Sequence, residues 1–353
     1  MLNKIEGCIL GAAAGDALGA PGEGKSSAQI QELFGGRIDH FAEPPCDVPA
    51  RGRKAGQVTD AFSIPYYLLE DIIAAGGMVT GDIACRSLLR WGDSEYFEPF
   101  AGMTTRKAVI RMNESKHLNT WDRIGHLGNK LFKGHYYALS SNGAAVKAWP
   151  AALMSGSDED MAIKLALQIA LSSHDDVLSV SGACAAAAAV SCALGCDSNS
   201  GMYEVVNAAL RGAEKGESMA RDMSEICVYP GPSVVKRIEM AIEAALHASR
   251  RAEPADELRD LIGCGPAIAE TVPTALGLLI AYGDDTLRCI SEAASIGDET
   301  SAIASITGAV LGALRGAETF PPEWIEFLDR QNGIDIKRTA AETEETARKL
   351  SQL

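Results

Sequence analysis

The side chains of this sequence that could do chemistry lie mainly in a few polar loops between apolar stretches. They are carboxylates, hydroxyls, amides and a histidine, and the loops are Gly15-Asp16 to Gly24, Thr59-Asp60, Ser140 to Gly143, Ser172 to Asp176 and Gly297 to Ser301. Binding and catalytic groups are often found on such loops, because a rigid scaffold holds them in place. We therefore expect these segments to build the functional site.

Two common kinds of catalytic site are not indicated. A serine nucleophile is disfavoured, because Ser140 and Ser141 do not lie in a Gly-x-Ser-x-Gly turn and no Ser/His/Asp order stands out. No Cys-x-x-Cys pair and no His/Cys cluster suggests a zinc site. The polar loop residues remain as the candidates.

The elements that must position these loops are predicted to be helices. Apolar residues recur at helical spacing over residues 64–73, 162–171, 180–194, 202–215 and 233–247. Alternating runs rich in Val, Ile and Thr are missing, so a sheet of any size is not expected. The many Ala and Gly residues allow close helix packing. We predict an all-α, compact, single-domain multi-helix bundle over residues 1–353, with a polar, exposed helix at about 336–353.

Composition and charge exclude some classes of partner. The chain has 353 residues, of which 47% are hydrophobic, which is enough for a large core. Its formal net charge of −15 argues against a nucleic-acid groove, since phosphate binding requires clustered Lys and Arg. No apolar stretch is long and polar-free enough to predict a membrane span, and the Ala-rich run from Gly182 to Leu194 falls short.

Cysteine usage and the first residues favour the cytoplasm. The nine cysteines are an odd number and lie mostly in apolar helical runs, which fits reduced thiols better than a disulfide framework. The N-terminus has Lys4 before an apolar stretch, as in a signal peptide. However, Glu6 precedes that stretch and Asp16 lies where cleavage would occur, so secretion is not predicted.

Several segments, taken in order along the chain, carry a family resemblance. They are Gly7-Cys8-Ile9-Leu10-Gly11-Ala12-Ala13-Ala14-Gly15-Asp16 continuing to Glu23, Gly56-Gln57-Val58-Thr59-Asp60, Gly102-Met103-Thr104-Thr105-Arg106, Ser141-Asn142-Gly143 continuing to Pro150, His174, Thr271 to Leu276, and Gly297 to Gly316. Together they resemble the motifs of ADP-ribosylglycohydrolases, over nearly the whole chain. The resemblance implies a bundle of many helices, two magnesium ions at the base of a cleft that receives ADP-ribose, and hydrolysis at the anomeric carbon of ribose.

The implied chemistry is physically coherent. The anomeric carbon develops oxocarbenium character, which an acidic site can stabilise while it activates water. Magnesium prefers near-octahedral oxygen ligands and commonly keeps several waters. Two such ions can polarise ribose hydroxyls and position the attacking water.

This sequence departs from the family at the implied metal site. Where the family has Thr-Asp-Asp-Thr, this chain has Thr59-Asp60-Ala61-Phe62. In the last segment, the family's Asp-x-Asp-Thr aligns without a gap to Glu299 and Ser301, with Ala302 at the threonine. A shift of one residue aligns it instead to Asp298 and Thr300, with Ser301 at the threonine.

The family resemblance implies four carboxylates as metal ligands, two from each segment, and either register leaves only two of them in this chain. Neutral oxygens compensate poorly for dehydrating two adjacent dications. Among the candidate ligands Thr59, Asp60, Asp298, Glu299 and Ser301, we expect one weakly held Mg²⁺ ion or none.

The resemblance also assigns the remaining site residues. Asp60, Glu23 and Glu299 (or Asp298) are the implied catalytic carboxylates, and the implied substrate-binding residues are Ser141, Asn142, Gly143, His174 and Thr105. Interpretations without a role in binding or catalysis stay open for three residues. Glu23 could be a solvated loop residue, His174 could be structural, and Asp16 could cap the end of a helix. Trp149 and Phe62 could stack on an adenine or belong to the core.

We therefore predict a hydrolase of a ribosyl glycosidic bond in an ADP-ribosyl or related conjugate. A catalytically impaired ADP-ribose-binding protein of the same fold is the alternative, and a purely structural role is the third. The expected partner is an ADP-ribose-like small molecule, with neither nucleic acid nor a membrane. Assembly into a homo-oligomer stays open, and the sequence does not identify the acceptor.

Overall fold

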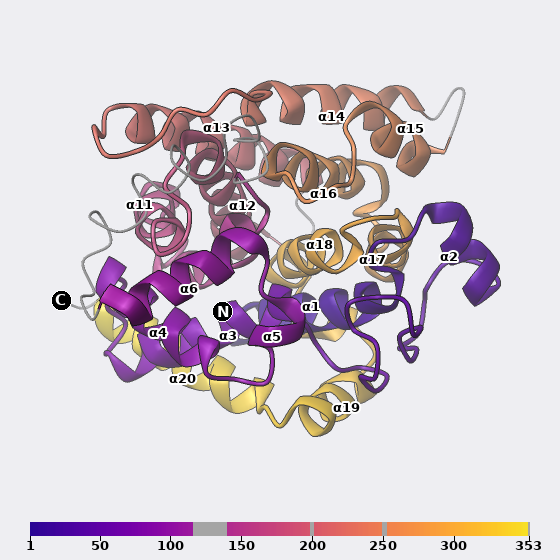
Figure 1. The fold of residues 1–353 in the computed structure, drawn as a ribbon, viewed down its shortest axis with the longest axis horizontal. Helices are drawn as coiled ribbons and strands as arrows, with labels where there is room; N and C mark the ends of the chain where they lie inside the picture. Colours follow the sequence, from indigo (N-terminus) through magenta and orange to yellow (C-terminus); the bar gives the residue numbers. More distant parts are fainter. Residues whose placement is uncertain (116–139, 198–200, 249–252, 352–353) are drawn as a thin grey trace.

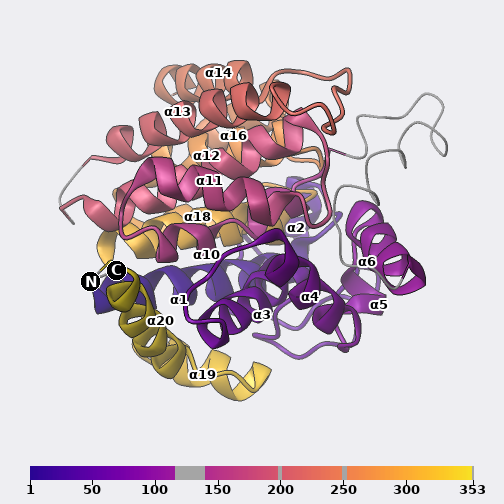
Figure 2. The ribbon, with the colours of Figure 1, turned by 90° about the vertical axis from the view of Figure 1, so that its left-hand side faces the viewer.

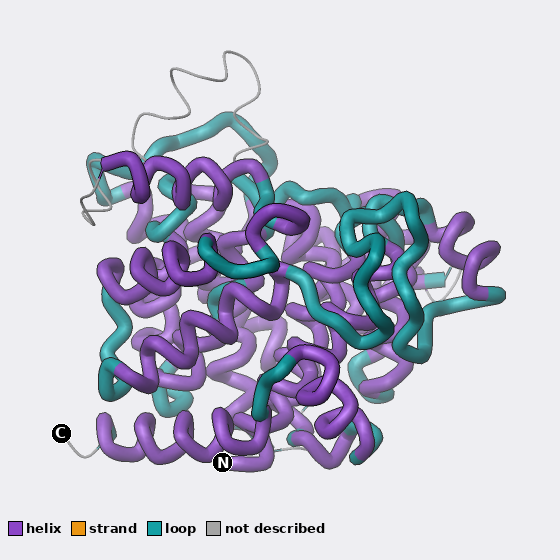
Figure 3. The backbone as a smooth tube through the Cα atoms, turned by 60° about the horizontal axis from the view of Figure 1, so that its bottom comes forward, coloured by secondary structure: helices purple, strands orange, loops and turns teal. Residues whose placement is uncertain are grey.

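The computed structural model describes residues 1–115, 140–197, 201–248 and 253–351. These residues form helices joined by loops, and no strand occurs among them (Figure 3). The α-helices are α1 (Leu2–Gly19), α2 (Ser27–Phe34), α3 (Asp60–Ala74), α4 (Gly81–Gly92), α5 (Phe97–Phe100), α6 (Met103–Ser115), α9 (Gly143–Val146), α10 (Trp149–Met154), α11 (Glu159–Ala170), α12 (Val177–Gly195), α13 (Met202–Arg221), α14 (Val234–Ala248), α15 (Pro254–Leu261), α16 (Ile268–Tyr282), α17 (Thr286–Ser295), α18 (Thr300–Arg315), α19 (Glu323–Asn332) and α20 (Ile336–Leu350).

The all-α prediction is confirmed, and each helix predicted from periodicity is present as part of α3, α11, α12, α13 or α14. The helices stack in successive layers (Figures 1 and 2). α13 and α14 form one outer layer, and α12 and α16 lie beneath them. α1 and α18 run through the middle of the molecule, and α3, α19 and α20 lie on the opposite side.

Helix α12 is the central core element. By length and composition alone it could cross a membrane, but 94% of its most apolar window is buried inside the structure. Its alanines from Ala185 to Ala189 are buried, and their small side chains allow neighbouring helices to approach closely. The apolar character of α12 is therefore explained by its place in the core.

Glycines bring α1 and α18 into direct backbone contact. A Cβ at Gly11 would lie 2.0 Å from the carbonyl oxygen of Gly308, and one at Gly7 would lie 2.4 Å from that of Gly312. At Gly19 the nearest atom would be the carbonyl oxygen of Thr300, at 2.4 Å. Larger residues cannot occupy these positions without separating the two helices. The contact places the end of α1 beside the start of α18.

The C-terminal helix is present as predicted, but it is not exposed all round. α20 buries Ile336, Thr339 and Ala340, and the hydroxyls of Thr339 and Tyr66 are 2.9 Å apart. Its apolar side chains fall on one face at helical spacing. This face joins α20 to the body of the molecule, while its acidic and basic residues lie on the outside.

Candidate active site

A cavity of about 510 Å³ opens where several parts of the chain meet. These are the end of α1, the loop before α3 and its first residue, the segment from α5 to the start of α6, the loop before α9, the start of α16 and the loop before α18. Its lining comprises Ala20, Glu23, Pro49, Ala50, Thr59, Asp60, Pro99, Phe100, Gly102, Met103, Thr104, Thr105, Ser141, Asn142, Gly143, Pro266, Ala267, Glu270, Glu299 and Ser301. Most of the polar loops identified in the sequence therefore converge on one place.

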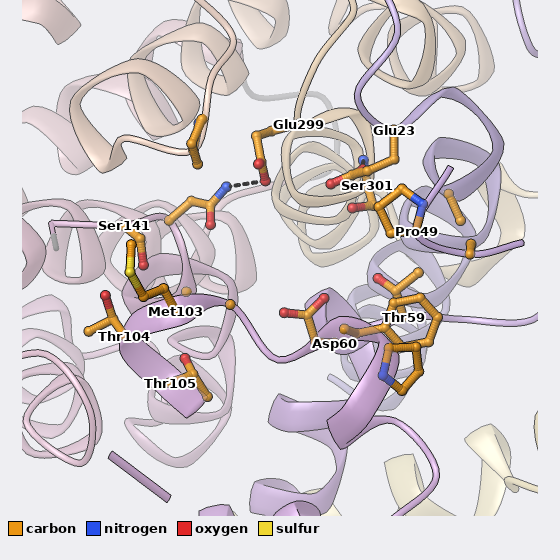
Figure 4. Close-up of a pocket in the computed structure, with 18 of the residues that line it drawn as sticks. Glu23, Pro49, Thr59, Asp60, Met103, Thr104, Thr105, Ser141, Glu299 and Ser301 are labelled. Carbon is orange, nitrogen blue, oxygen red and sulfur yellow. Dashed lines mark hydrogen bonds between the residues drawn. The ribbon is translucent and has the colours of Figure 1, made fainter. Parts of the chain in front are cut away.

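Four acidic residues line this cavity, and Glu23, Asp60 and Glu299 are the three that the sequence singled out. Glu23 follows α1, Asp60 is the first residue of α3, and Glu299 directly precedes α18. In Figure 4 their side chains point toward a common opening, with Thr104, Thr105 and Ser141 on its other side. Segments almost 300 positions apart in the sequence thus supply one acidic cluster, with Glu23 and Ser301 separated by 278 positions.

Asp16 positions the start of α3. One of its carboxylate oxygens accepts hydrogen bonds from the backbone N–H groups of Thr59, at 2.8 Å, and Phe62, at 2.9 Å. The other accepts from the Thr59 hydroxyl at 2.6 Å. Asp16 is fully buried, and this burial raises its pKa to about 7. Asp16 therefore caps a neighbouring helix and orients Thr59 and Asp60, rather than capping its own.

Glu23 and Glu299 are each held by a hydrogen-bond donor. Glu23 accepts from the backbone N–H of Ser301 at 3.0 Å, at the start of α18. Glu299 accepts from the side-chain amide of Asn142 at 2.8 Å, the bond drawn as a dashed line in Figure 4. Both carboxylates are therefore fixed in orientation toward the cavity.

The electrostatics of the cluster favour a bound cation or retained protons. Burial, followed by the negative charges of Asp16 and Glu299, raises the pKa of Asp60 to about 8. Burial, followed by the charge of Glu299, raises the pKa of Glu23 well above its ordinary value. Burial also raises the pKa of Glu299, although the Asn142 hydrogen bond opposes this. Strongly shifted groups in a cavity are typical of functional sites.

The two registers considered for the last segment differ in where they place the side chains. Glu299 and Ser301 line the cavity. Asp298 is exposed to solvent, and the Thr300 hydroxyl donates to the carbonyl of Gly19 at 2.7 Å. The alignment without a gap is thus the one whose two residues, Glu299 and Ser301, both line the cavity. Asp298 does not line it.

The segment Ser141-Asn142-Gly143 forms the opposite wall. The Asn142 N–H donates to the carbonyl of Pro266 at 2.9 Å, which ties this loop to the one before α16. A Cβ at Gly143 would lie 3.3 Å from His174 Cε1 and 3.4 Å from Thr105 Oγ1. A side chain at this position would press against both neighbours.

His174 and the two aromatic candidates do not line the cavity. His174 is fully buried behind Ser141, with its Nε2 2.7 Å from the Ser141 Oγ. Phe62 and Trp149 are buried, and their ring centroids are 6.4 Å apart in a stacked arrangement. The core interpretation of these aromatics therefore holds in this structure.

Some residues at or near the site were missed in the sequence. Phe100, Met103 and Glu270 line the cavity, and Lys147 is buried close behind it. Lys147 and Met103 lie within segments that carry the family resemblance, but neither was singled out there. Phe100 and Glu270 lie in none of those segments, because they reach the cavity through tertiary packing.

A cation would find suitable ligands in the cavity. Glu23, Asp60 and Glu299 supply carboxylates, and Thr59 and Ser301 supply hydroxyls. The Thr59 proton is committed to Asp16, which leaves a lone pair on its oxygen. These are oxygen donors of the kind that Mg²⁺ prefers, but the three carboxylates lie too far apart for one ion to bind all of them directly.

A second group of potential metal ligands lies away from the cavity. One ligand atom each from Cys192, Cys196 and Glu204 lies within 4.8 Å of the others. The two sulfurs are 3.6 Å apart. The sequence did not indicate this group, because the cysteines are four positions apart on a helix end and the glutamate comes from the next helix.

Comparison with known proteins shows similarity to one family over nearly the whole chain. Residues 1–352 match the family model described as ADP-ribosylglycohydrolase. Similar proteins include YegU of Escherichia coli K12, described as uncharacterized, which is 26% identical with 96% of this chain and 95% of the relative covered. The bovine and human ADP-ribosylhydrolases ARH3 are 26% and 24% identical, covering 95% of this chain and 91% and 92% of theirs.

A solved structure shares the fold. A chain of an "ADP-ribosylglycohydrolase-related protein complex" superposes with a TM-score of 0.63 at 18% identity, covering 98% of each chain. The likeness extends over the full helical bundle.

Proposed function

Because the chain belongs to the ADP-ribosylglycohydrolase family, we propose that it is a hydrolase that cleaves a ribosyl glycosidic bond in an ADP-ribosyl or related ribosyl conjugate. The observation that carries this proposal is the convergence of Glu23, Asp60 and Glu299 on one cavity. A family of glycohydrolases and an acidic cavity point to the same class of chemistry.

The three carboxyl groups have distinct roles in this proposal. Asp60 has a pKa of about 8, raised by burial, so it holds a proton near neutral pH when no cation is present. A protonated carboxyl can donate to the leaving group as glycosidic C–O or C–N cleavage proceeds. Glu299, held by Asn142, is placed to stabilise positive charge on the ribose or to activate water.

A single Mg²⁺ ion would be held by the carboxylates of Asp60, Glu299 and Glu23, not all of them directly, because their oxygens do not lie close enough together for one ion to contact all three. Bound there, it would supply Lewis-acid polarisation of ribose hydroxyls. We propose one weakly held ion, because Ala61 and Ser301 stand where the family resemblance expects carboxylates.

Isothermal titration calorimetry of ADP-ribose into the purified protein tests the proposal, first with Mg²⁺ and then with a chelator. Binding that requires Mg²⁺ supports a metal-assisted site, and binding indifferent to the chelator supports a metal-free one. Absence of binding in both conditions would contradict ADP-ribose as the ligand.

The alternative, an ADP-ribose-binding protein without catalysis, predicts the same calorimetric result. Turnover separates the two proposals. ADP-ribosylated peptides with arginine or serine acceptors are incubated with the protein, and released ADP-ribose is measured. Release that depends on Asp60 supports the hydrolase, whereas tight binding without release supports the sensor.

A further inference from the structure

Lys147 is a buried lysine whose hydrogen-bond partners among the described residues include no carboxylate. Its side chain is 2% exposed, and its Nζ donates to the Ala170 carbonyl at 3.5 Å, the Ser172 hydroxyl at 3.0 Å and the Ser173 hydroxyl. These bonds use all three ammonium protons. Burying an ammonium group costs several kcal/mol unless its environment compensates, so this position needs a reason.

Lys147 is connected to the cavity by a continuous chain of hydrogen bonds. The Ser173 Oγ lies 2.8 Å from the Nδ1 of His174. The Nε2 on the other side of the ring lies 2.7 Å from the Ser141 Oγ. Ser141 lines the cavity. The relay therefore runs from Lys147 through Ser173 and His174 to a hydroxyl at the cavity wall.

The chemistry of the first member sets the direction of every bond in this relay. Below its pKa of about 7, Lys147 is an ammonium group with donors and no acceptor, so Ser173 accepts from it and turns its own proton toward Nδ1 of His174. Burial, with the charge of Lys147, lowers the pKa of His174 well below its ordinary value, so the ring is neutral. A neutral ring that accepts at Nδ1 carries its proton on Nε2 and donates to Ser141.

A hydrogen-bond donor at Ser141 would help the cavity to bind an anionic group of a ligand. Among the described residues that line it, none is Lys, Arg or His, and Glu23, Asp60 and Glu299 repel an anion. Ser141 lies on the wall opposite Glu23 (Figure 4). A hydroxyl that accepts from His174 is free to direct its own proton into the cavity.

We propose that Lys147 is a positioning residue which, through Ser173 and His174, fixes the Ser141 hydroxyl as a hydrogen-bond donor to an anionic oxygen of the ligand. Through this relay, Lys147 fixes the direction of a hydrogen bond at a cavity wall whose described residues include no basic side chain. The direction of the relay holds whatever the ligand is, and only the identity of the ligand rests on the proposed function.

A purely structural role for Lys147 makes different predictions. Ala170 is the last residue of α11, and an ammonium group at a helix C-terminus stabilises the helix. That role would need the lysine but would not affect the proton position on His174. Ser172 and Ser173 form a matched pair of test sites, because both bond to Lys147 and only Ser173 continues to the histidine.

The experiment is long-range ¹H–¹⁵N NMR of the full-length protein labelled with ¹⁵N-histidine, at pH 6. The His174 resonances are identified by their loss in His174→Gln. Lys147 has a pKa of about 7 and is mainly cationic at this pH. We expect a neutral ring with its proton on Nε2 in the wild type, in Ser172→Ala and in Lys147→Arg. In Lys147→Met, a form with the proton on Nδ1 should appear.

Two outcomes would overturn the proposal. One is a wild-type His174 with its proton on Nδ1, because the relay would then run from Ser141 toward the lysine. The other is a Lys147→Met spectrum identical to that of the wild type. If Lys147→Met does not fold, Ser173→Ala replaces it: the Nδ1 shift should move to that of an unbonded acceptor nitrogen, and an unchanged shift would contradict the relay.

A ligand measurement completes the test. Ser141→Ala should weaken ADP-ribose binding about tenfold, the loss expected for a hydrogen bond to a charged group. Lys147→Met should weaken it similarly, and Ser172→Ala should not. Unchanged affinity in Ser141→Ala would refute the donor role. If the wild type binds no ADP-ribose, the proposed function fails, while the NMR result on the relay still stands.

Discussion

At the level of single residues, the cavity brings together carboxyl groups whose negative charges repel one another. Glu23, Asp60 and Glu299 could be singled out in the sequence, because their types and positions match family motifs. The roles of Asp16 and Lys147 could not be derived from the sequence. Each acts through a partner that is distant along the chain, so no local pattern reports it.

Asp60→Asn tests the catalytic assignment. The amide keeps the size of the side chain but removes its acidity, so kcat/KM for ADP-ribosyl peptide hydrolysis should fall about 100-fold or more. The matched control is Asp82→Asn, an exposed aspartate on α4. Equal loss in both variants, or an unchanged rate in Asp60→Asn, would remove Asp60 from the mechanism.

The pH dependence of stability follows from the raised pKa of Asp60. Its value in the folded protein is about 8, against an ordinary 3.8. Between these values the folded state binds more protons than the unfolded one, so this group's contribution to stability falls as pH rises through the window. Asp60→Asn removes the effect. Its Tm should exceed that of the wild type at pH 8 by about 2–4 °C and differ little at pH 4.

Addition of Mg²⁺ provides the complementary measurement. A cation bound only by the folded state raises Tm. We expect this at pH 8 for the wild type and a smaller rise for Asp60→Asn. A Tm difference between the two proteins that is the same at both pH values would contradict the shifted pKa.

At the level of elements, the site depends on how α1, α3 and α18 meet. The helices themselves could be predicted, since apolar periodicity is a local property. Their pairing could not, because glycines at spacing four are compatible with many partners. In the structure, Gly11 of α1 contacts Gly308 of α18, and Asp16 of α1 caps α3. α1 therefore aligns both helices whose first residues carry the carboxylates.

Gly308→Ala should destabilise the protein by about 3 kcal/mol, because its Cβ would lie 2.0 Å from the carbonyl oxygen of Gly11 and the helices must separate. Urea unfolding measures the change. Gly201→Ala is the control, since a Cβ there meets no atom within 4 Å and the cost should be a few tenths of a kcal/mol. Similar midpoints for both variants would show that the contact is not tight.

Asp16→Ala should cost about 2 kcal/mol or more, because it leaves the buried N–H groups of Thr59 and Phe62 without their acceptor. Activity should fall further than stability alone explains, since Asp60 loses its orientation. The comparison is made at a temperature where the variant is fully folded by circular dichroism. Full activity under that condition would assign Asp16 to stability only.

At the level of the whole molecule, the all-α class and the family were accessible from the sequence, while the spatial arrangement was not. The helical period and the lack of alternating runs settled the class. The sequence left the register of the segment Asp298-Glu299-Thr300-Ser301 open between an alignment without a gap and one shifted by a single residue. Only the turn before α18 separates the exposed Asp298 from Glu299 in the cavity.

The contact between α1 and α18 also has a consequence for biosynthesis. Gly19 and Thr300 are joined by a hydrogen bond across 281 positions. A ribosome adding about 5–20 residues per second needs tens of seconds to pass from one helix to the other. During that interval the nascent α1 presents its apolar surface without its partner. The three carboxylates of the cavity can therefore come together only after Glu299, near the start of the last sixth of the chain, has been translated.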